Sequence, residues 1–113
     1  MAVNGAFQAG GKTYQIVTNA ATPTNLTVNS DSPCNQYRLV NHATQPVYVW
    51  ISPGANPTNV ALPTGSGAYA HVVPPSSQTV VTGPQISSTT SVRLSAIAES
   101  GTPEIYITPG EGM

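Results

Sequence analysis

Short segments rich in Val, Ile, Thr and Tyr recur about every ten residues along this chain, and Gly, Pro or Asn residues separate them. Side chains that are β-branched or aromatic suit a pleated sheet better than a helix. No stretch shows helical periodicity sustained over successive turns. The pattern predicts an all-β chain, a single β-sandwich or jelly-roll-like domain of seven to nine short antiparallel strands.

The strands are expected where apolar residues alternate or run together between turn signals. These segments are residues 12–18, 25–29, 37–40, 47–51, 60–62, 69–73, 78–82, 92–98 and 104–108. Gly83 and Pro84 are expected to open a loop that runs to Ser91. The closing segment from Pro109 to Met113 is expected not to extend a sheet, because proline cannot donate to a ladder.

Residues 1–33 contain few apolar positions, whereas the clearest strand patterns begin after them. We expect residues 1–33 to form an extended N-terminal arm with one or two short strands, and residues 34–113 to form the β-sandwich domain. A two-strand arm with few anchors is marginally stable alone. Such an arm could add a strand to a partner's sheet. Deletion of residues 1–30 would then leave a folded core that no longer binds its partner.

The segment from Val47 to Ile51 has two apolar faces, because successive side chains of a strand point to opposite sides. Val47, Val49 and Ile51 share one face, and Tyr48 and Trp50 share the other. Such a strand is either central in a two-layer sandwich or has its aromatic face covered by another chain. A third possibility is that Trp50 is simply half-exposed.

Charged side chains are scarce: the 113 residues include three Lys or Arg and four Asp or Glu, or 6%, against about 25% in typical domains. Three scattered cations cannot neutralise a phosphate backbone, so no nucleic-acid partner is expected. Four scattered acids leave little for a carboxylate pair or an oxygen-ligand metal cage. Catalysis draws mainly on perturbed titratable groups. The composition therefore favours a structural or binding role over an enzyme.

The remaining candidates for metal chemistry are two histidines, His42 and His71, and the single cysteine, Cys34. Their spacing matches no metal-ligand motif, so we expect no metal and no cofactor. Cys34 cannot form an internal disulfide and is expected to be structural. Residues 1–11 lack the features of a signal peptide, and no segment approaches the roughly 18 apolar residues of a membrane span. We therefore expect synthesis without export and no membrane partner.

A surface with so little charge tends to associate, and sheet edges without charged residues are poorly protected against strand pairing. We therefore expect a homo-oligomer or another permanent assembly. Arg38 and Arg93 could anchor a partner through their guanidinium groups. They could equally form pairs with Glu99 or Glu104 within the chain.

Residues 36–112 resemble small virion proteins of tailed bacteriophages and prophages. The segments that carry this resemblance are Tyr37–Asn41 with Gln45–Val49, the pair Leu62–Pro63, and the end Ile105–Gly112, which includes Thr-Pro-Gly-Glu-Gly. The resemblance implies a capsid decoration, or cement, protein: a compact β-sandwich that binds the outside of the shell and stabilises it. It also implies synthesis in the host cytoplasm, location at the capsid surface, and the major capsid protein and further copies of this chain as partners.

Two other functions fit the same sequence. One is another virion component, such as a head fibre, a spike or a tail adaptor. The other is a carbohydrate-binding β-sandwich module, in which Tyr48, Trp50, Tyr69 and Tyr106 form a stacking platform for a glycan. The contact surfaces are expected in the N-terminal arm and in the uncharged stretch from Leu39 to Val92. The candidate interface residues are Phe7, Tyr14, Leu26, Val28, Arg38, Tyr48, Trp50, Tyr69, Arg93 and Tyr106.

Overall fold

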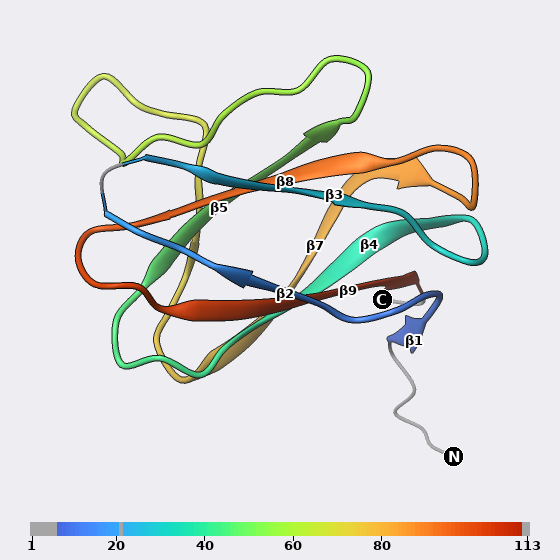
Figure 1. Cartoon of the computed structure of the whole chain (residues 1–113), viewed down its shortest axis with the longest axis horizontal. Coiled ribbons are helices and arrows are strands. Elements are labelled where there is room, and N and C mark those ends of the chain that lie inside the picture. The colour runs from blue at the N-terminus through green and yellow to red at the C-terminus, as the bar shows by residue number, and fades with distance from the viewer. Residues whose placement is uncertain (1–6, 21, 112–113) are drawn as a thin grey trace.

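The computed structural model describes residues 7–20 and 22–111, and these residues form nine antiparallel strands in two sheets, with no helix among them (Figure 1). The first sheet has the order β1-β9-β4-β7, and β2 also pairs with β9; the second has the order β3-β8-β5-β6. The strands are β1 (Gln8–Ala9), β2 (Tyr14–Val17), β3 (Thr24–Val28), β4 (Cys34–Asn41), β5 (Val47–Pro53), β6 (His71–Val73), β7 (Ser77–Ile86), β8 (Val92–Ala98) and β9 (Glu104–Glu111). This arrangement confirms the all-β prediction and is that of a β-sandwich.

The core lies between the two sheets and is built from alternate residues of the paired strands. The first sheet supplies Tyr37 and Leu39 from β4 and Ile105 and Ile107 from β9, all fully buried. The second sheet supplies fully buried residues of β5 and β8, namely Val47, Val49, Val92, Leu94 and Ala96. The aliphatic alternation in the sequence therefore marks the inward face of each strand.

Tyr37 is the largest of the fully buried side chains, and its hydroxyl group donates a hydrogen bond to the carbonyl oxygen of Pro84. Burial raises the pKa of the Tyr37 phenol well above its ordinary value, and the nearby Cys34 thiol adds to this increase. The folded protein therefore holds this proton more tightly than the unfolded chain does.

Alkaline pH should destabilise the fold through Tyr37. Below the unfolded-state pKa of about 10 the phenol is protonated in both states, so its effect on stability does not change with pH. Above that value the unfolded chain loses the proton while the folded chain keeps it, so the free energy of unfolding should fall by about 1.4 kcal/mol per pH unit. Urea unfolding between pH 9 and 11 measures this slope. Tyr37→Phe should lack the Tyr37 contribution, and an unchanged slope in that variant would contradict the assignment.

The N-terminal segment is built into both sheets. β2 pairs with β9 and β3 pairs with β8, so consecutive strands lie in different sheets. Ile16 of β2 and Val28 of β3 are buried in the core, at 3% and 0% exposure. The division predicted at residue 33 therefore separates no two packing units, because β2 and β3 pair within the chain itself. Residues 1–6 of the predicted arm lie outside the described residues.

The prediction that the segment from Pro109 onward cannot extend a sheet is wrong, because β9 continues to Glu111. The carbonyl oxygen of Pro109 accepts a hydrogen bond from the backbone N–H of Gly10. In an antiparallel strand the N and O of one residue point to the same side. The missing N–H therefore faces residues 10–13, between β1 and β2, and not the ladder with β4. Gly112 and Met113 lie outside the described residues.

Two further expectations about strands need correction. β7 continues through Gly83 and Pro84, where a loop was expected. This is possible because β7 is an edge strand, and its pairing with β4 shifts register between Cys34 and Gln36. Residues 60–62 form no strand, since they belong to the long connection between β5 and β6.

That connection lies against the outer face of the second sheet. The backbone N–H of Thr58 donates to Ser52 Oγ at 2.9 Å, and that of Val60 donates to Ser95 Oγ at 3.0 Å. Val60 is almost fully buried there. The apolar residues of this segment therefore pack on the sheet and do not pair within it. The sequence left open whether the strand at residues 47–51 is central in the sandwich or covered by another chain. β5 is an inner strand, and the chain's own loop partly covers its outer face.

Candidate functional site

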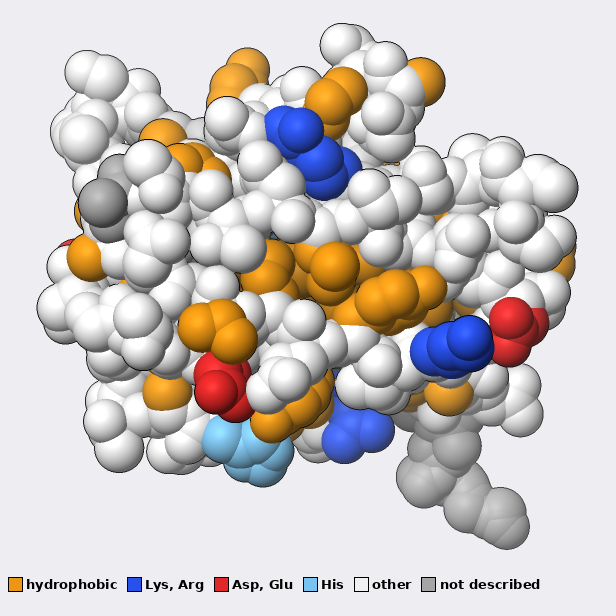
Figure 2. Space-filling view, in the orientation of Figure 1, with side chains coloured by type: hydrophobic (Ala, Val, Ile, Leu, Met, Phe, Trp, Pro, Cys, Tyr) orange, Lys and Arg blue, Asp and Glu red, His pale blue; other side chains and the backbone are white. Residues whose placement is uncertain are grey.

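The side of the sandwich formed by β2 and β3 carries a strip of partly buried apolar side chains. The two strands lie next to each other but belong to different sheets, and each pairs with one strand only. Figure 2 shows hydrophobic side chains gathered between β3 and β2. Tyr14 and Leu26 are partly buried and pack against the core, and Tyr14 OH donates to Asn29 Oδ1 at 3.1 Å. We call this surface the β2–β3 side.

The four lateral edges of the sandwich are unequally protected against pairing with another chain. Natural sheets protect exposed edges with charged residues, proline, bulges or very short strands. β7 has Pro84 and a register shift, and β6 is only three residues long. β2 and β3 carry none of these features, because the sequence from Thr13 to Ser30 has no charged residue and neither strand contains proline. Both unprotected edges therefore belong to the β2–β3 side.

The predicted aromatic platform is divided between the two outer faces. Tyr48 and Trp50 lie on the outer face of the second sheet, where the Trp50 ring contacts Tyr69 and stacks on His71, both at 5.3 Å between ring centroids. Tyr106 belongs to β9 of the first sheet. Tyr69 is 63% exposed, whereas the ring of Trp50 is contacted by the rings of both Tyr69 and His71. The four side chains expected to form one glycan platform are not brought together.

The two arginines differ in their surroundings. Arg93 lies on the outer face of the second sheet and donates through Nη2 to Asn59 Oδ1 at 2.5 Å. Its Nε is buried without a hydrogen-bond partner among the described residues. Arg38 is exposed on the outer face of the first sheet and donates through Nε to Gln78 Oε1 at 2.8 Å. Neither arginine forms the ion pair with Glu99 or Glu104 that the sequence left open, within the described part of the chain.

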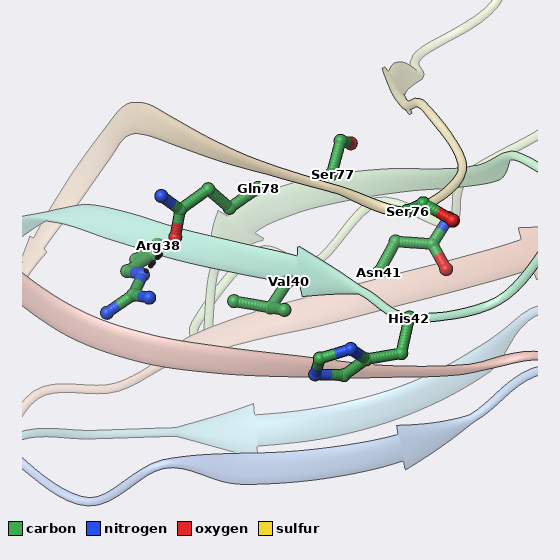
Figure 3. A pocket seen from close by; sticks show the side chains of 7 residues that line it. All are labelled: Arg38, Val40, Asn41, His42, Ser76, Ser77 and Gln78. Atoms are coloured by element: carbon green, nitrogen blue, oxygen red, sulfur yellow. Dashed lines mark hydrogen bonds between the residues drawn. The ribbon is translucent and has the colours of Figure 1, made fainter.

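A hollow of about 380 Å³ adjoins Arg38 on the outer face of the first sheet. Arg38, Val40 and His42 project from the same side of β4 and its end, and Gln78 reaches toward Arg38 from β7 (Figure 3). His42 also borders a second hollow, of about 290 Å³, with Glu104 and Tyr106. Its ring meets that of Tyr106 edge-on at 5.8 Å. The sequence pointed to Arg38 and Tyr106 separately, and the structure places them on one face.

The remaining candidate residues differ in how far they are buried. Phe7 is partly buried and packs over Gly110, where a Cβ would lie 2.5 Å from the Phe7 ring. Val28 is completely buried in the core, so its assignment to an interface is wrong. The alternation of Val28 with Leu26 could not predict this burial, because the residues on one face of an edge strand show the same pattern whether the core or a partner covers them. Cys34 is also buried and has a free thiol.

The described residues contain no group of three or more His, Cys, Asp or Glu side chains that could hold a metal ion. No helix long and apolar enough to cross a membrane occurs in the same residues. Comparisons with protein families, with curated proteins and with solved structures find no match for this chain.

Proposed function

We propose that this chain is a structural virion protein of the capsid-decoration type, which binds the outer surface of a bacteriophage head and stabilises the shell. The observation that carries the proposal is the β2–β3 side, where two uncharged edge strands flank an apolar strip. Edges of this kind invite pairing with another chain. A protein that stays packed against neighbours in a permanent assembly can tolerate such a surface, and the resemblance of residues 36–112 to small virion proteins supports the same role.

The partners proposed for this surface are the major capsid protein and further copies of the chain. Strand addition would give affinity through main-chain hydrogen bonds along β2 or β3, and Tyr14 and Leu26 would supply apolar area. A cement role needs no titratable machinery. It needs extended edges that bridge neighbouring subunits, repeated in many copies around the shell.

A lysine on β3 should prevent this binding without disturbing the fold. Asn25 is exposed on this edge strand, opposite Ser95. Asn25→Lys places a charge on the outer face of β3, beside the position of an added strand, so occupancy on shells should fall by about tenfold or more, which corresponds to about 1.4 kcal/mol. The measurement is co-sedimentation of the purified variant with shells that lack the protein.

Gln85→Lys is the matched control, because Gln85 is an exposed amide on β7, the protected edge of the first sheet. Its binding to shells should equal that of the unmodified chain. Equal loss of binding in both variants would show that the contact is not specific to the β2–β3 side. Full binding by Asn25→Lys would refute a contact at that side.

Other virion roles predict different phenotypes. Particles that lack a cement protein lose head integrity when heated or treated with a chelator. Particles that lack a head fibre, a spike or a tail adaptor keep their heads and lose adsorption to cells. The same preparation therefore separates the proposed role from its nearest alternatives. The glycan-binding role is less well supported, because Tyr106 lies on the opposite face of the sandwich from Tyr48 and Trp50 and the four aromatic residues form no single platform.

A further inference from the structure

The hollow beside Arg38 presents hydrogen-bond donors and a positive charge (Figure 3). Arg38 uses Nε to bind Gln78 Oε1, and its two terminal nitrogens have no hydrogen-bond partner among the described residues. Because Gln78 accepts through its oxygen, its amide NH₂ group is left as a donor. Both groups lie on the outer face of the first sheet, at neighbouring positions of β4 and β7.

Among the residues that the structure describes, no acidic side chain forms an ion pair with Arg38. The residues that line the hollow include no Asp or Glu. Glu104, which borders the adjacent hollow, accepts a hydrogen bond from Gln15 Nε2 at 2.7 Å. The nearest acidic side chain on this face, Glu104, borders the adjacent hollow and not this one, so the exposed guanidinium group of Arg38 forms no ion pair within the described part of the chain.

The residues that line and border the hollow favour a carboxylate side chain over a sugar as its ligand. Val40 supplies a partly buried aliphatic surface next to Arg38. Tyr106, which lies opposite Val40 on the neighbouring strand, already meets the ring of His42 edge-on. A sugar ring would seek an open aromatic face on which to stack. An aspartate or glutamate side chain instead offers an aliphatic stem for Val40 and a carboxylate for the guanidinium fork.

We propose that this hollow binds a carboxylate supplied by an acidic side chain of a partner protein, with Arg38 as the bidentate donor and Gln78 as the residue that positions it. Charge complementarity carries the choice of occupant: an unneutralised arginine on a flat sheet face is matched by an acidic residue on the facing surface. The inference rests on the proposed function only in expecting that this partner is found in the virion.

The test uses the isolated full chain, labelled with ¹⁵N, and the peptide acetyl-Gly-Glu-Gly-amide as the probe. Saturable shifts are expected at the Arg38 Nε–H and Gln78 side-chain amide resonances. The peptide acetyl-Gly-Gln-Gly-amide, which has no carboxylate, should bind at least about tenfold more weakly. Absence of saturable shifts, or equal binding of the two peptides, would overturn the proposal.

Three variants and a second probe complete the design. Arg38→Gln should abolish the shifts, and Arg38→Lys, which keeps the charge but loses the fork, should weaken binding several-fold. Lys12→Gln removes one exposed charge outside the hollow and should bind as the unmodified chain does. Glucuronate should bind more weakly than the glutamate peptide, and tighter binding would reassign the site to a sugar acid.

The outcome is independent of the proposed function. A chain that binds the glutamate peptide but no shell would refute the decoration role and leave the carboxylate site intact. A chain that binds shells equally well with and without Arg38, and shows no response to the peptide, would refute the carboxylate site alone.

Discussion

A chain that begins at residue 31 should fail to fold. This truncation removes β1, β2 and β3, and with them Ile16 and Val28 from the core. It also exposes the edges of β9 and β8, against which the lost strands pair. Loss of a buried aliphatic side chain costs about 1–5 kcal/mol, whereas a small domain is stable by only about 5–15 kcal/mol in all. We expect no cooperative thermal transition and no near-ultraviolet circular dichroism signal.

The matched control is a chain that begins at residue 7, which keeps every strand described above. It should unfold cooperatively, with a melting temperature within a few degrees of that of the full chain. The comparison tests whether the N-terminal third is an appendage or part of the sandwich. Cooperative unfolding of the chain that begins at residue 31 would show that the remaining strands fold without β2 and β3.

Tyr37→Ala should lower the free energy of unfolding by about 3–5 kcal/mol, the range for loss of a buried aromatic side chain. Tyr37 is wholly buried between the sheets, and its ring lies 3.1 Å from the position that a Cβ on Gly83 would occupy. The substitution leaves a cavity that the surrounding β-branched residues cannot easily fill, because their side chains have few rotamers. Urea denaturation with linear extrapolation measures the change.

Tyr37→Phe separates the hydroxyl from the ring. It keeps the volume but leaves the carbonyl oxygen of Pro84 without its partner, which should cost about 1–3 kcal/mol. Tyr69→Phe is the control, because Tyr69 is 63% exposed and its loss of a hydroxyl should change stability by less than about 0.5 kcal/mol. If Tyr37→Ala were as mild as Tyr69→Phe, the core would not be organised around Tyr37.

The sequence predicted strands best where alternation was strong. The segment 92–98 coincides with β8, and the segment 47–51 lies within β5. Both are inner strands of the second sheet, so their side chains meet the core on one face and a sheet-covering layer on the other. Local pattern sufficed there because the pattern and the burial have the same period.

Local pattern failed where a distant neighbour decides the conformation. Pro109 is compatible with β9 only because its missing N–H faces residues 10–13, about a hundred positions away in sequence. Val60 is buried although it belongs to no strand, because the loop that carries it is bonded to the second sheet through Ser95. In the same way, nothing within residues 14–28 reveals that β2 and β3 enter different sheets of their own chain.

The surfaces were predicted in part. Arg38 stood out because cations are rare in this chain, but Gln78 could be found only from the register that sets it opposite Val40. The aromatic residues were predicted to form one platform, and only the topology shows that β5 and β9, which carry Trp50 and Tyr106, belong to different sheets. Residue type therefore indicated the chemistry, and topology decided which residues act together.

The copy number of this chain in purified virions tests the central proposal most directly. Quantitative mass spectrometry against labelled peptides from this chain and from the major capsid protein gives the ratio of the two. A decoration protein should be present at a fixed ratio that matches the lattice of the shell, so tens to hundreds of copies per particle are expected, on the order of the number of shell subunits or of their symmetry axes. Absence from the particle, or a few copies confined to one vertex or the tail, would contradict the account.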